Sequence, residues 1–548
     1  MDFVEIKKIV EKIKARRSLC VGKWNDNARY LGSARKFNSG INAQEGGMEN
    51  DSSNGSKYPL VDYTAGNSCV RSANIIMTML LGEGEDVITI LPKEHISGSA
   101  SNPYEKITEK VNNVLRFRDS QFNTAKRQYF RDLRQFGNVG IGFTFDEQDG
   151  YQFITYGVDT LGLYVVNGKI HGYSDIRSMT ANEVNDFTGI NVYSEEECRQ
   201  DGKKTLVQLF LKNPDYKYSE KLGSGAYKWV RYWYTEDKDG LIKTDYFKTN
   251  PIKITRKNLE IGDWYGRGQA ESLINTVVAL NRSVLMTLIG AEKMIDPAVW
   301  MYLSGQLNKM KLDRRPGAVN KINPNDAPGG NPLGTIGDII DPSKLLEFGI
   351  PYLQKQITNA YNIDELLDLN SNGNTMTARE VIIRRDLRAI TITSEFSEIR
   401  ETFEELFMDL VEDMYDRGFF DEEIKQIKGE DENKEVKFRL VFNGDFDIMQ
   451  RTRKSTRTMS YLQDIAPIIQ VVGKDALNAN DWFKMMQDIE TANGVENYLC
   501  TEEEYNKSVQ GRMQGEQMMQ QLEAMKIAAD AQGRNGNVGV GTNLPASA

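Results

Sequence analysis

The stretch DWYGRGQAESLINTVVALNRSVLMTLIGAEKMIDPAV, from Asp263 to Val299, decides how the rest of the chain is interpreted. It opens on an aromatic and glycine-rich turn and then continues without a proline for about eight helical turns. It ends at Pro297, which lacks a backbone donor and disfavours helical geometry at Asp296. The stretch therefore predicts one long helix.

Apolar residues recur along this predicted helix in steps of three and four, which marks one face. They are Leu273, Val277, Leu280, Val284, Leu288, Ala291 and Ile295. The opposite flank carries Asn275, Arg282, Glu292 and Lys293, which suit water or a polar lumen. The apolar face needs a partner surface, and periodicity alone fits an ordinary core helix as well as a structural wall.

The composition limits the class of protein. The chain has 548 residues, 68 of them basic and 78 acidic, for a net charge of −10. That length allows several domains of roughly 100–200 residues each. A sequence-reading DNA-binding protein usually carries a basic patch, so the acidic balance argues against that class. It still permits a protein that lets DNA pass without holding it, because phosphate contacts bring strong, salt-dependent affinity.

The cysteines and the apolar runs indicate a soluble protein of a reducing compartment. Cys20, Cys69, Cys198 and Cys500 are far apart and form no CxxC pair, which argues against a zinc site or a disulfide framework. The amphipathic N-terminus lacks the apolar core of a signal peptide. Apolar runs such as residues 73–81 are shorter than a membrane span, so we expect no membrane partner.

Searches for catalytic motifs return little. The chain has two histidines, His95 and His171, and no HExxH, GxSxG or GxxxxGK[ST] motif. Residues 266–271 resemble half of a dinucleotide fingerprint, but the third glycine and the surrounding βαβ unit are missing. The runs 195–197 and 502–504 are solvated charge runs more often than acid/base pairs. We predict no enzyme, no cofactor and no metal site.

The pattern along the chain predicts an α+β fold with mostly α-helix. Helices are expected at residues 1–40, 63–81, 107–136, 342–369 and 377–417, and mostly helix over 447–532. Strands are expected at 86–91 and 436–444, in a hairpin turning at Asp149-Gly150, and in a β-rich module over 155–255. Residues 300–342 are rich in glycine and proline and predict irregular or short-strand structure.

Two segments without catalytic residues have a possible function. The loop Asn370, Ser371, Asn372, Gly373, Asn374 and Thr375 is polar, uncharged and placed between two predicted helices. It is either a surface connection or a mobile loop at a constriction, where neutral groups touch a phosphate backbone without holding it. Near the C-terminus, Met518, Leu522, Met525 and Ala529 follow helical seam spacing over too few turns to predict a coiled coil.

Five blocks, taken in order, resemble the portal (head-to-tail connector) proteins of short-tailed bacteriophages. They are VDYTAGNSCVRSANIIMTMLL (61–81), RQYFRDLRQFGNVGIGFTF (127–145), WYGRGQAESLINTVVALNR (264–282), MTAREVIIRRDL (376–387) and TANGVENYLCTEEE (491–504). Gln269, Arg379 and Glu496 depart from the residues common at those places in the family, and none of these departures removes a functional group. The blocks cover most of the chain.

The resemblance implies a phage portal fold that assembles into a ring, typically a dodecamer, at one capsid vertex of the virion. A separate terminase would drive double-stranded DNA inward through the channel, and the DNA would later leave by the same route. The implied partners are further copies of the chain, DNA held without sequence preference, terminase, tail adaptor proteins, and the major capsid and scaffolding proteins. The chain itself would be made in the bacterial host cytoplasm.

The order of the blocks implies a role for each segment. Residues 1–150 and 300–454 would form the wing, 151–262 the clip, 263–299 the stem helix, 368–378 the tunnel loop, and 455–548 the crown with a flexible tail. Leu273, Val277, Leu280, Val284 and Leu288 would pack the stem helix. Tyr265, Gly266, Arg267 and Gly268 would form the turn between clip and stem, where glycine permits unusual backbone conformations.

Two other classes remain open. A structural virion or scaffold-type oligomer without a DNA channel would explain the solubility and the helices, but not the ordered blocks. A nucleic-acid enzyme or packaging ATPase would need a Walker motif or a metal-binding carboxylate set, and the sequence shows neither.

Overall fold

The computed structural model describes the greater part of the chain. The described residues are 2–33, 35–37, 44–45, 60–82, 86–92, 102–200, 202–217, 223–296, 299–302, 313, 315, 318–322, 333–335, 345–361, 378–428 and 438–448, with scattered residues between 461 and 527. Residue contacts divide the chain into two units. Unit 1 comprises Met1–Val87 and Val111–Phe419, and unit 2 comprises Ile88–Lys110 and Phe420–Ala548.

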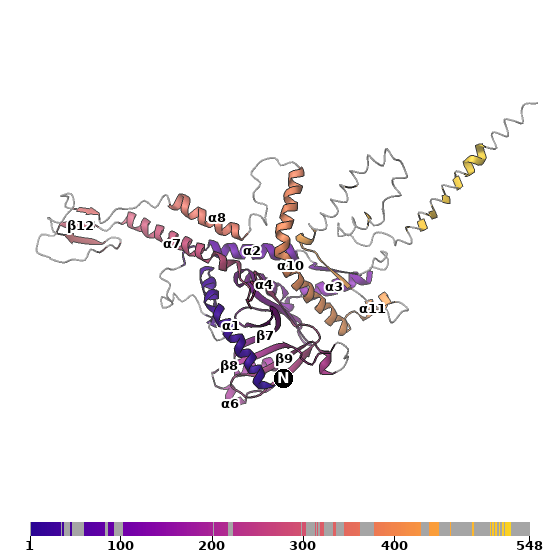
Figure 1. Cartoon of the computed structure of the whole chain (residues 1–548), viewed down its shortest axis with the longest axis horizontal. Helices are drawn as coiled ribbons and strands as arrows, with labels where there is room; N and C mark the ends of the chain where they lie inside the picture. The colour runs from indigo at the N-terminus through magenta and orange to yellow at the C-terminus, as the bar shows by residue number, and fades with distance from the viewer. Residues whose placement is uncertain are drawn as a thin grey trace, which may run out of the picture. The chain divides into compact units, whose positions relative to one another are not determined.

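Helices supply most of the regular structure, and the strands gather in separate sheets (Figure 1), so the fold class is α+β as predicted. The main helices are α1 (Phe3–Tyr30), α2 (Thr64–Leu81), α3 (Asn102–Arg116), α4 (Phe122–Phe136), α5 (Ala181–Thr188), α6 (Glu195–Cys198), α7 (Gln269–Ile295), α8 (Ile350–Ala360), α10 (Ala378–Asp416) and α11 (Asp421–Lys428).

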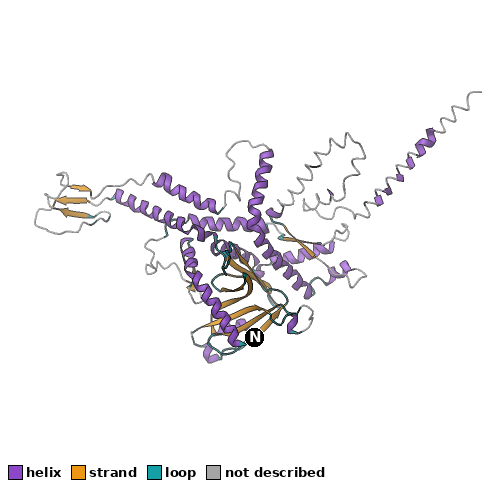
Figure 2. Ribbon diagram, viewed as in Figure 1, coloured by secondary structure: helices purple, strands orange, loops and turns teal. Residues whose placement is uncertain are grey.

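Unit 1 contains an antiparallel five-stranded sheet (Figure 2). Its strands are β6 (Leu161–Val166), β7 (Lys169–Thr180), β8 (Lys203–Lys212), β9 (Trp229–Thr235) and β10 (Lys243–Phe247), which pair in chain order. The predicted β-rich module over 155–255 is therefore confirmed as β-structure. The helices α5 and α6 lie between β7 and β8 in the chain.

The first half of α1 and the helix α5 cover opposite faces of this sheet. One face presents Ile176, Val207, Leu209, Leu211, Val230, Tyr232 and Tyr234, which pack with Ile6, Val10 and Ile13 of α1. The other face presents Leu206 and Trp233, which pack with Ala181 and Val184 of α5 and with Tyr193. The register agrees, because Val207 is paired with Tyr234 and Leu206 with Thr235, and paired residues point to one side. The outer surfaces of α1 and of α5–α6 therefore look in opposite directions.

The helix α1 forms because its buried residues recur every three or four positions and because Asp2 and Glu5 make a capping box at its start. Arg17, on the buried side of this helix, is fully buried. Its guanidinium donates to the carbonyl oxygens of Val158, at 2.8 Å and 3.2 Å, and of Asp159, at 3.2 Å. These charge-assisted bonds fix α1 to the turn that precedes β6.

A second sheet, in the order β11-β4-β5, joins the β-rich module to the helices before it. Its strands are β4 (Asn138–Asp146), β5 (Gly150–Tyr156) and β11 (Ile252–Arg256). The hairpin predicted at residues 138–156 is confirmed, with Gly150 at φ +75°. The segment boundary expected at 150/151 falls inside this hairpin, and β11 pairs with β4 across it. Residues 151–262 are therefore continuous with the rest of unit 1.

The single helix expected over residues 107–136 is wrong, because two helices occupy this segment. The helix α3 ends at Arg116, a short 3-10 turn covers Arg118–Ser120, and α4 begins at Phe122. The break begins at Phe117, whose ψ of 131° leaves the helical region, and it ends at Gln121, which has a left-handed φ of +54° that its amino-acid type does not announce. The left-handed terminator predicted at Gly137 is confirmed, with φ +75°.

The second half of α10 is fixed to the body of unit 1. Phe403 stacks on Phe130 with ring centroids 5.6 Å apart. The Lys253 ammonium on β11 pairs with Asp409 at 2.7 Å, and the lysine side chain is 6% exposed. A third sheet, in the order β13-β12-β14, comprises Val319–Ile322, Val299–Tyr302 and Leu333–Thr335 and lies between α7 and α8 in the chain.

Unit 2 contains an antiparallel pair of strands from distant parts of the chain. The strand β3 (Ile88–Pro92) pairs with β15 (Phe438–Phe442), and both were expected from the sequence. The Lys110 ammonium pairs with Glu423 of α11 at 2.7 Å. Contacts thus place residues 88–110 and 420–454 in one unit, whereas the sequence assigned them to the two wing segments.

Candidate functional site: the long helix and its glycine turn

The helix predicted from the opening stretch is present as α7, and the turn before it is held by one asparagine. The side-chain oxygen of Asn138 accepts from the N–H of Gly266 at 2.6 Å, and its amide donates to the Gly266 carbonyl at 2.8 Å. Two backbone bonds continue this contact: Lys257 N–H to Gly137 O at 2.8 Å, and Arg267 N–H to Lys257 O at 2.7 Å. We call residues 265–268 together with Asn138 the glycine clasp.

The glycines of the clasp are required by close backbone approach. A Cβ built on Gly266 would lie 2.3 Å from the Lys257 carbonyl oxygen, and one on Gly268 would lie 2.4 Å from that of Gln135. Gly268, the N-cap of α7, has an ordinary extended conformation with φ −70° and ψ 155°. The expectation that glycine serves here through unusual backbone angles is wrong for Gly268, and the need for space replaces it.

The clasp also uses the backbone donors that a phosphate would need. The N–H groups of Gly266 and Arg267 are both occupied by protein acceptors. A dinucleotide fingerprint depends on free N–H groups in its glycine turn. Two backbone donors of this turn are thus engaged within the protein.

Aromatic packing and ion pairs hold the clasp against α1. Tyr265 is buried, its hydroxyl accepts from the N–H of Leu163 at 3.0 Å, and its ring meets Trp24 edge-on at 5.2 Å. Burial raises the pKa of Tyr265. Glu271 in the first turn of α7 pairs with Lys23 of α1 at 2.7 Å. A cleft of about 210 Å³ lies between α1 and residues 262–271.

The apolar stripe of α7 has partners within the same chain along its first half. Val277 and Leu280 are buried, and Leu273 and Val284 pack beside them. Their neighbours are Leu31, Ala65, Cys69, Ile350, Ile357 and Tyr361. The Gln269 amide donates to the Ala360 carbonyl at 2.8 Å, so the start of α7 lies at the end of α8 and the two helices are antiparallel.

The second half of α7 exposes its apolar residues. Leu288 is 55% exposed and Ile295 is 85% exposed, with Met286 and Met294 also exposed. In length and hydropathy α7 meets the criteria for a membrane-spanning helix, and only 22% of its most apolar stretch is buried. This finding corrects the expectation that every apolar run is shorter than a span. It also separates the predicted packing residues into a covered group (Leu273 to Val284) and the uncovered Leu288.

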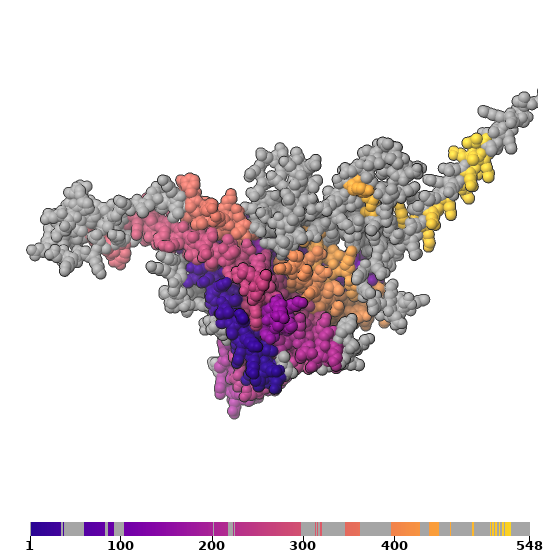
Figure 3. Space-filling model, viewed as in Figure 1, coloured from indigo at the N-terminus to yellow at the C-terminus, as the bar shows by residue number. Residues whose placement is uncertain are grey.

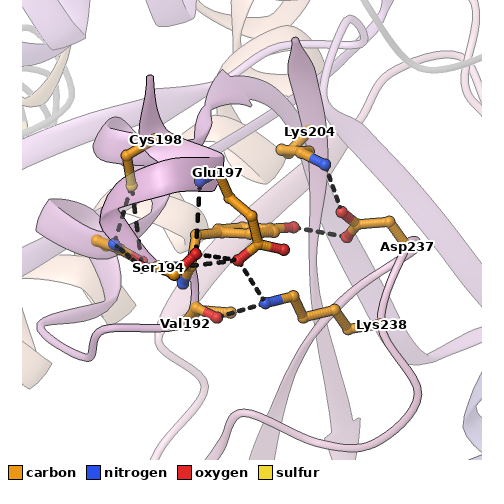
Figure 4. A network of polar contacts seen from close by, with 9 residues as sticks. Val192, Ser194, Glu197, Cys198, Lys204, Asp237 and Lys238 are labelled. Atoms are coloured by element: carbon orange, nitrogen blue, oxygen red, sulfur yellow. Dashed lines mark hydrogen bonds and ion pairs between the residues drawn. The ribbon is translucent and has the colours of Figure 1, made fainter. Parts of the chain in front are cut away.

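The helices α5 and α6 form a second feature of the site, clamped onto β8 and β9 (Figure 4). The ring of Tyr193 lies between the Lys204 and Lys238 ammonium groups, 5.1 Å and 4.3 Å from its centroid. Its hydroxyl donates to Asp237 at 2.5 Å, and Lys238 donates to the Val192 carbonyl at 2.6 Å. The backbone N–H of Ser194 holds the pKa of Glu197 below its usual range. The helices α5 and α6 are therefore a fixed part of the β-rich module.

The loop Asn370–Thr375, and most of the wider segment 368–378, lie outside the described residues, as does His95. His171 lies on β7. Among the residues that the structure describes, no group of three or more histidine, cysteine or acidic side chains is arranged to hold a metal ion.

Comparison with known proteins identifies the family. The family model described as "Bacteriophage head to tail connecting protein" matches residues 4–500. The chain therefore belongs to this family, which confirms the resemblance seen in the five sequence blocks. Membership makes it a protein of the virion, located where the head connects to the tail.

Two solved structures of gene transfer agent particles are similar at low identity. The first is "Neck of empty GTA particle computed with C6 symmetry", with 10% identity, a TM-score of 0.35, and coverage of 72% of this chain and 85% of that chain. The second is "Virion of native gene transfer agent (GTA) particle", with 9% identity, a TM-score of 0.34, and coverage of 73% and 85%. These similarities are too low to assign individual parts. No curated protein matches the chain in sequence.

Sequence reasoning missed Asn138, the residue that holds the clasp. Its bonding partners in Gly266 are distant in the chain, so periodicity and turn rules do not report them. The signal available was the asparagine directly after the helix terminator Gly137. A polar side chain at that place is well positioned to bond neighbouring backbone groups.

Proposed function

We propose that the chain is the portal subunit of a phage particle and forms a ring, a dodecamer in the implied assembly, around a DNA channel at one capsid vertex. A separate terminase would package double-stranded DNA through this ring, and the ring would later release the DNA and carry the tail. Family membership supports the connector role. The ring, the channel and the terminase contact belong to the proposal.

The observation that carries the ring is the uncovered half of α7. A soluble protein rarely exposes contiguous apolar side chains unless another surface covers them. Leu288 and Ile295, seven residues apart and therefore on one side of α7, are 55% and 85% exposed, while the first half of the same helix is already packed. For a component of the virion connector, we infer that neighbouring copies cover these side chains and that lipid does not.

The acidic balance supports passage of DNA through the channel. Each copy carries a net charge of −10, so a ring would repel phosphate over much of its surface. Repulsion limits the tight, salt-dependent binding that would stop DNA from moving. The uncharged loop 370–375 is proposed as the exception that contacts DNA within the channel.

We propose a different segment for the clip than the one expected from the sequence. The two ends of residues 151–262, β5 and β11, pair with β4, and the five-stranded sheet between them packs on α1, so the segment lies in the body of unit 1. The sheet β12–β14 instead follows α7 and precedes α8, two helices that pack antiparallel. This arrangement favours β12–β14 as the clip, the surface that meets terminase and tail adaptor proteins, while α7 keeps the stem role.

Negative-stain imaging of the purified full chain tests the proposal. We expect rings with a central hole wide enough for duplex DNA. Added tail adaptor proteins are expected to give extra density at the end of the ring that carries β12–β14. A chain that stays monomeric at every protein concentration would contradict the ring, and density around the outer rim would return the clip role to residues 151–262.

Shortening the loop 370–375 is expected to separate assembly from DNA handling. Rings should form as in the wild-type protein, because the loop contributes no predicted packing residues. DNA packaging or retention should fall, since the proposed contact with the DNA backbone is lost. The measurements are ring counts by imaging and packaged DNA protected from nuclease. Loss of rings would show that the loop is structural.

A further inference from the structure

The outer face of α1 carries a row of three exposed basic residues. Lys8, Lys12 and Arg16 follow one another at intervals of four, so they share one side of the helix. Figure 3 shows α1 at the surface of the molecule. Val4 and Leu19 add apolar area to this side, at 58% and 71% exposed.

The lysines that border this face behave differently. Lys7 pairs with Asp239 at 3.0 Å, and Lys14 pairs with Glu236, so both serve to fix α1 to the β9–β10 turn. In the described part of the chain, no ion pair involves Lys8 or Lys12. Glu5 and Glu11 lie on the same side, so between Val4 and Leu19 the face carries three basic residues against two acidic ones, and Arg16 also lies over the Trp264 ring at 5.4 Å.

The outer face of α5 and α6 has the opposite charge. Asp186, Glu195 and Glu196 are exposed, together with the apolar side chains of Phe187 and Ile190. Glu195 and Glu196 also stabilise α6 through its N-terminal dipole, but that role does not explain the exposed apolar pair. Each face therefore combines apolar residues with a charge that suits the other.

The two faces look in opposite directions, because α1 and α5–α6 cover opposite sides of the five-stranded sheet. One copy thus carries complementary surfaces on its two sides. A closed ring needs such an arrangement, since adjacent copies in a cyclic assembly meet through two different patches.

We propose that the outer face of α1 in one copy docks on the outer face of α5–α6 in the next copy, as a lateral contact of the ring. The occupant is a second copy of this chain, and the argument is charge complementarity with apolar area on both sides. The inference rests on the proposed ring and adds a specific contact to it, separate from the contact made by α7.

Charge reversal on each face tests the contact. One variant combines Lys8→Glu and Lys12→Glu, and a second combines Glu195→Lys and Glu196→Lys. Each should raise the protein concentration needed for half-maximal assembly by about tenfold or more, because like charges across an interface reject a partner. Sedimentation velocity of the full chain at about 0.1 M salt measures the shift, where charges still act over about 10 Å.

Two restorations make the test specific. An equimolar mixture of the two variants should regain wild-type assembly, since each reversed face then meets the reversed face of the other variant. The chain with all four substitutions should regain it alone. Lys169→Glu with Lys228→Glu, two exposed lysines away from the face, is the matched control and should assemble as the wild type does.

The outcomes separate this inference from the ring itself. A wild-type chain that never assembles would overturn the proposed function. Wild-type rings with unaffected reversal variants, or with no restoration in the mixture, would overturn the α1 contact alone. Circular dichroism confirms that each variant is folded. If a reversal variant is unfolded, the milder Lys8→Gln with Lys12→Gln must still weaken assembly, or the inference fails.

Discussion

Gly268→Ala is expected to lower the free energy of unfolding by about 3 kcal/mol, within the upper range for overpacked sites. The added Cβ would lie 2.4 Å from the Gln135 carbonyl oxygen and 2.7 Å from its carbonyl carbon. Both are backbone atoms at the end of α4, so no side-chain rotation relieves the clash. The variant should be less stable because the added methyl group would push apart two backbone segments that the clasp bonds hold together.

The measurement is the apparent melting temperature at one fixed protein concentration, because assembly shifts it. Gly202→Ala is the matched control, since nothing lies within 4 Å of a Cβ there. It should change the free energy of unfolding by less than about 0.5 kcal/mol. Asn138→Ala should resemble Gly268→Ala, because it removes two bonds to buried Gly266 backbone groups. Equal melting temperatures for Gly268→Ala and Gly202→Ala would contradict the prediction, because they would show that the two backbone segments move apart at little cost.

The features that the sequence predicted well depend on local signals. The long helix was placed by Pro297 at one end and by the glycine turn at the other, and α7 lies between them. Gly137 was recognised because glycine readily adopts the left-handed terminator. The break at Gln121 was missed, because a glutamine with φ +54° has no such signature in its residue type.

The features that were missed depend on tertiary contacts. The stripe of α7 was visible from periodicity, but periodicity does not say which surface covers it. Its partners Ile350, Ile357 and Tyr361 come from α8 and its end, far along the chain. The opposite outward charges of α1 and α5–α6 became visible only when the sheet register showed that these helices lie on different faces.

Leu288→Asp with Ile295→Asp is expected to abolish ring assembly without unfolding the subunit. Both side chains are largely exposed in the single chain, so a carboxylate there stays hydrated and costs the subunit little. In the ring the same carboxylate would be buried against a neighbouring copy without a partner, which is strongly unfavourable. The measurements are the mass distribution by sedimentation velocity and the melting temperature of the unassembled subunit.

Val277→Asp on the same helix is the contrasting variant. Val277 is 3% exposed inside the cluster shared by α2, α7 and α8, so an unpaired charge there should destabilise the subunit itself by several kcal/mol. The pair of variants thus divides α7 into a half that holds the subunit together and a half that joins copies.

Flotation of the wild-type chain with lipid vesicles tests the alternative that a lipid surface covers the exposed half of so apolar a helix. Co-flotation, with assembly unchanged in the double variant, would assign the exposed half to a lipid surface. If the double variant still forms rings and the wild-type chain binds no vesicles, the exposed half of α7 makes no contact in the ring. If the double variant forms no rings, neighbouring copies cover that half.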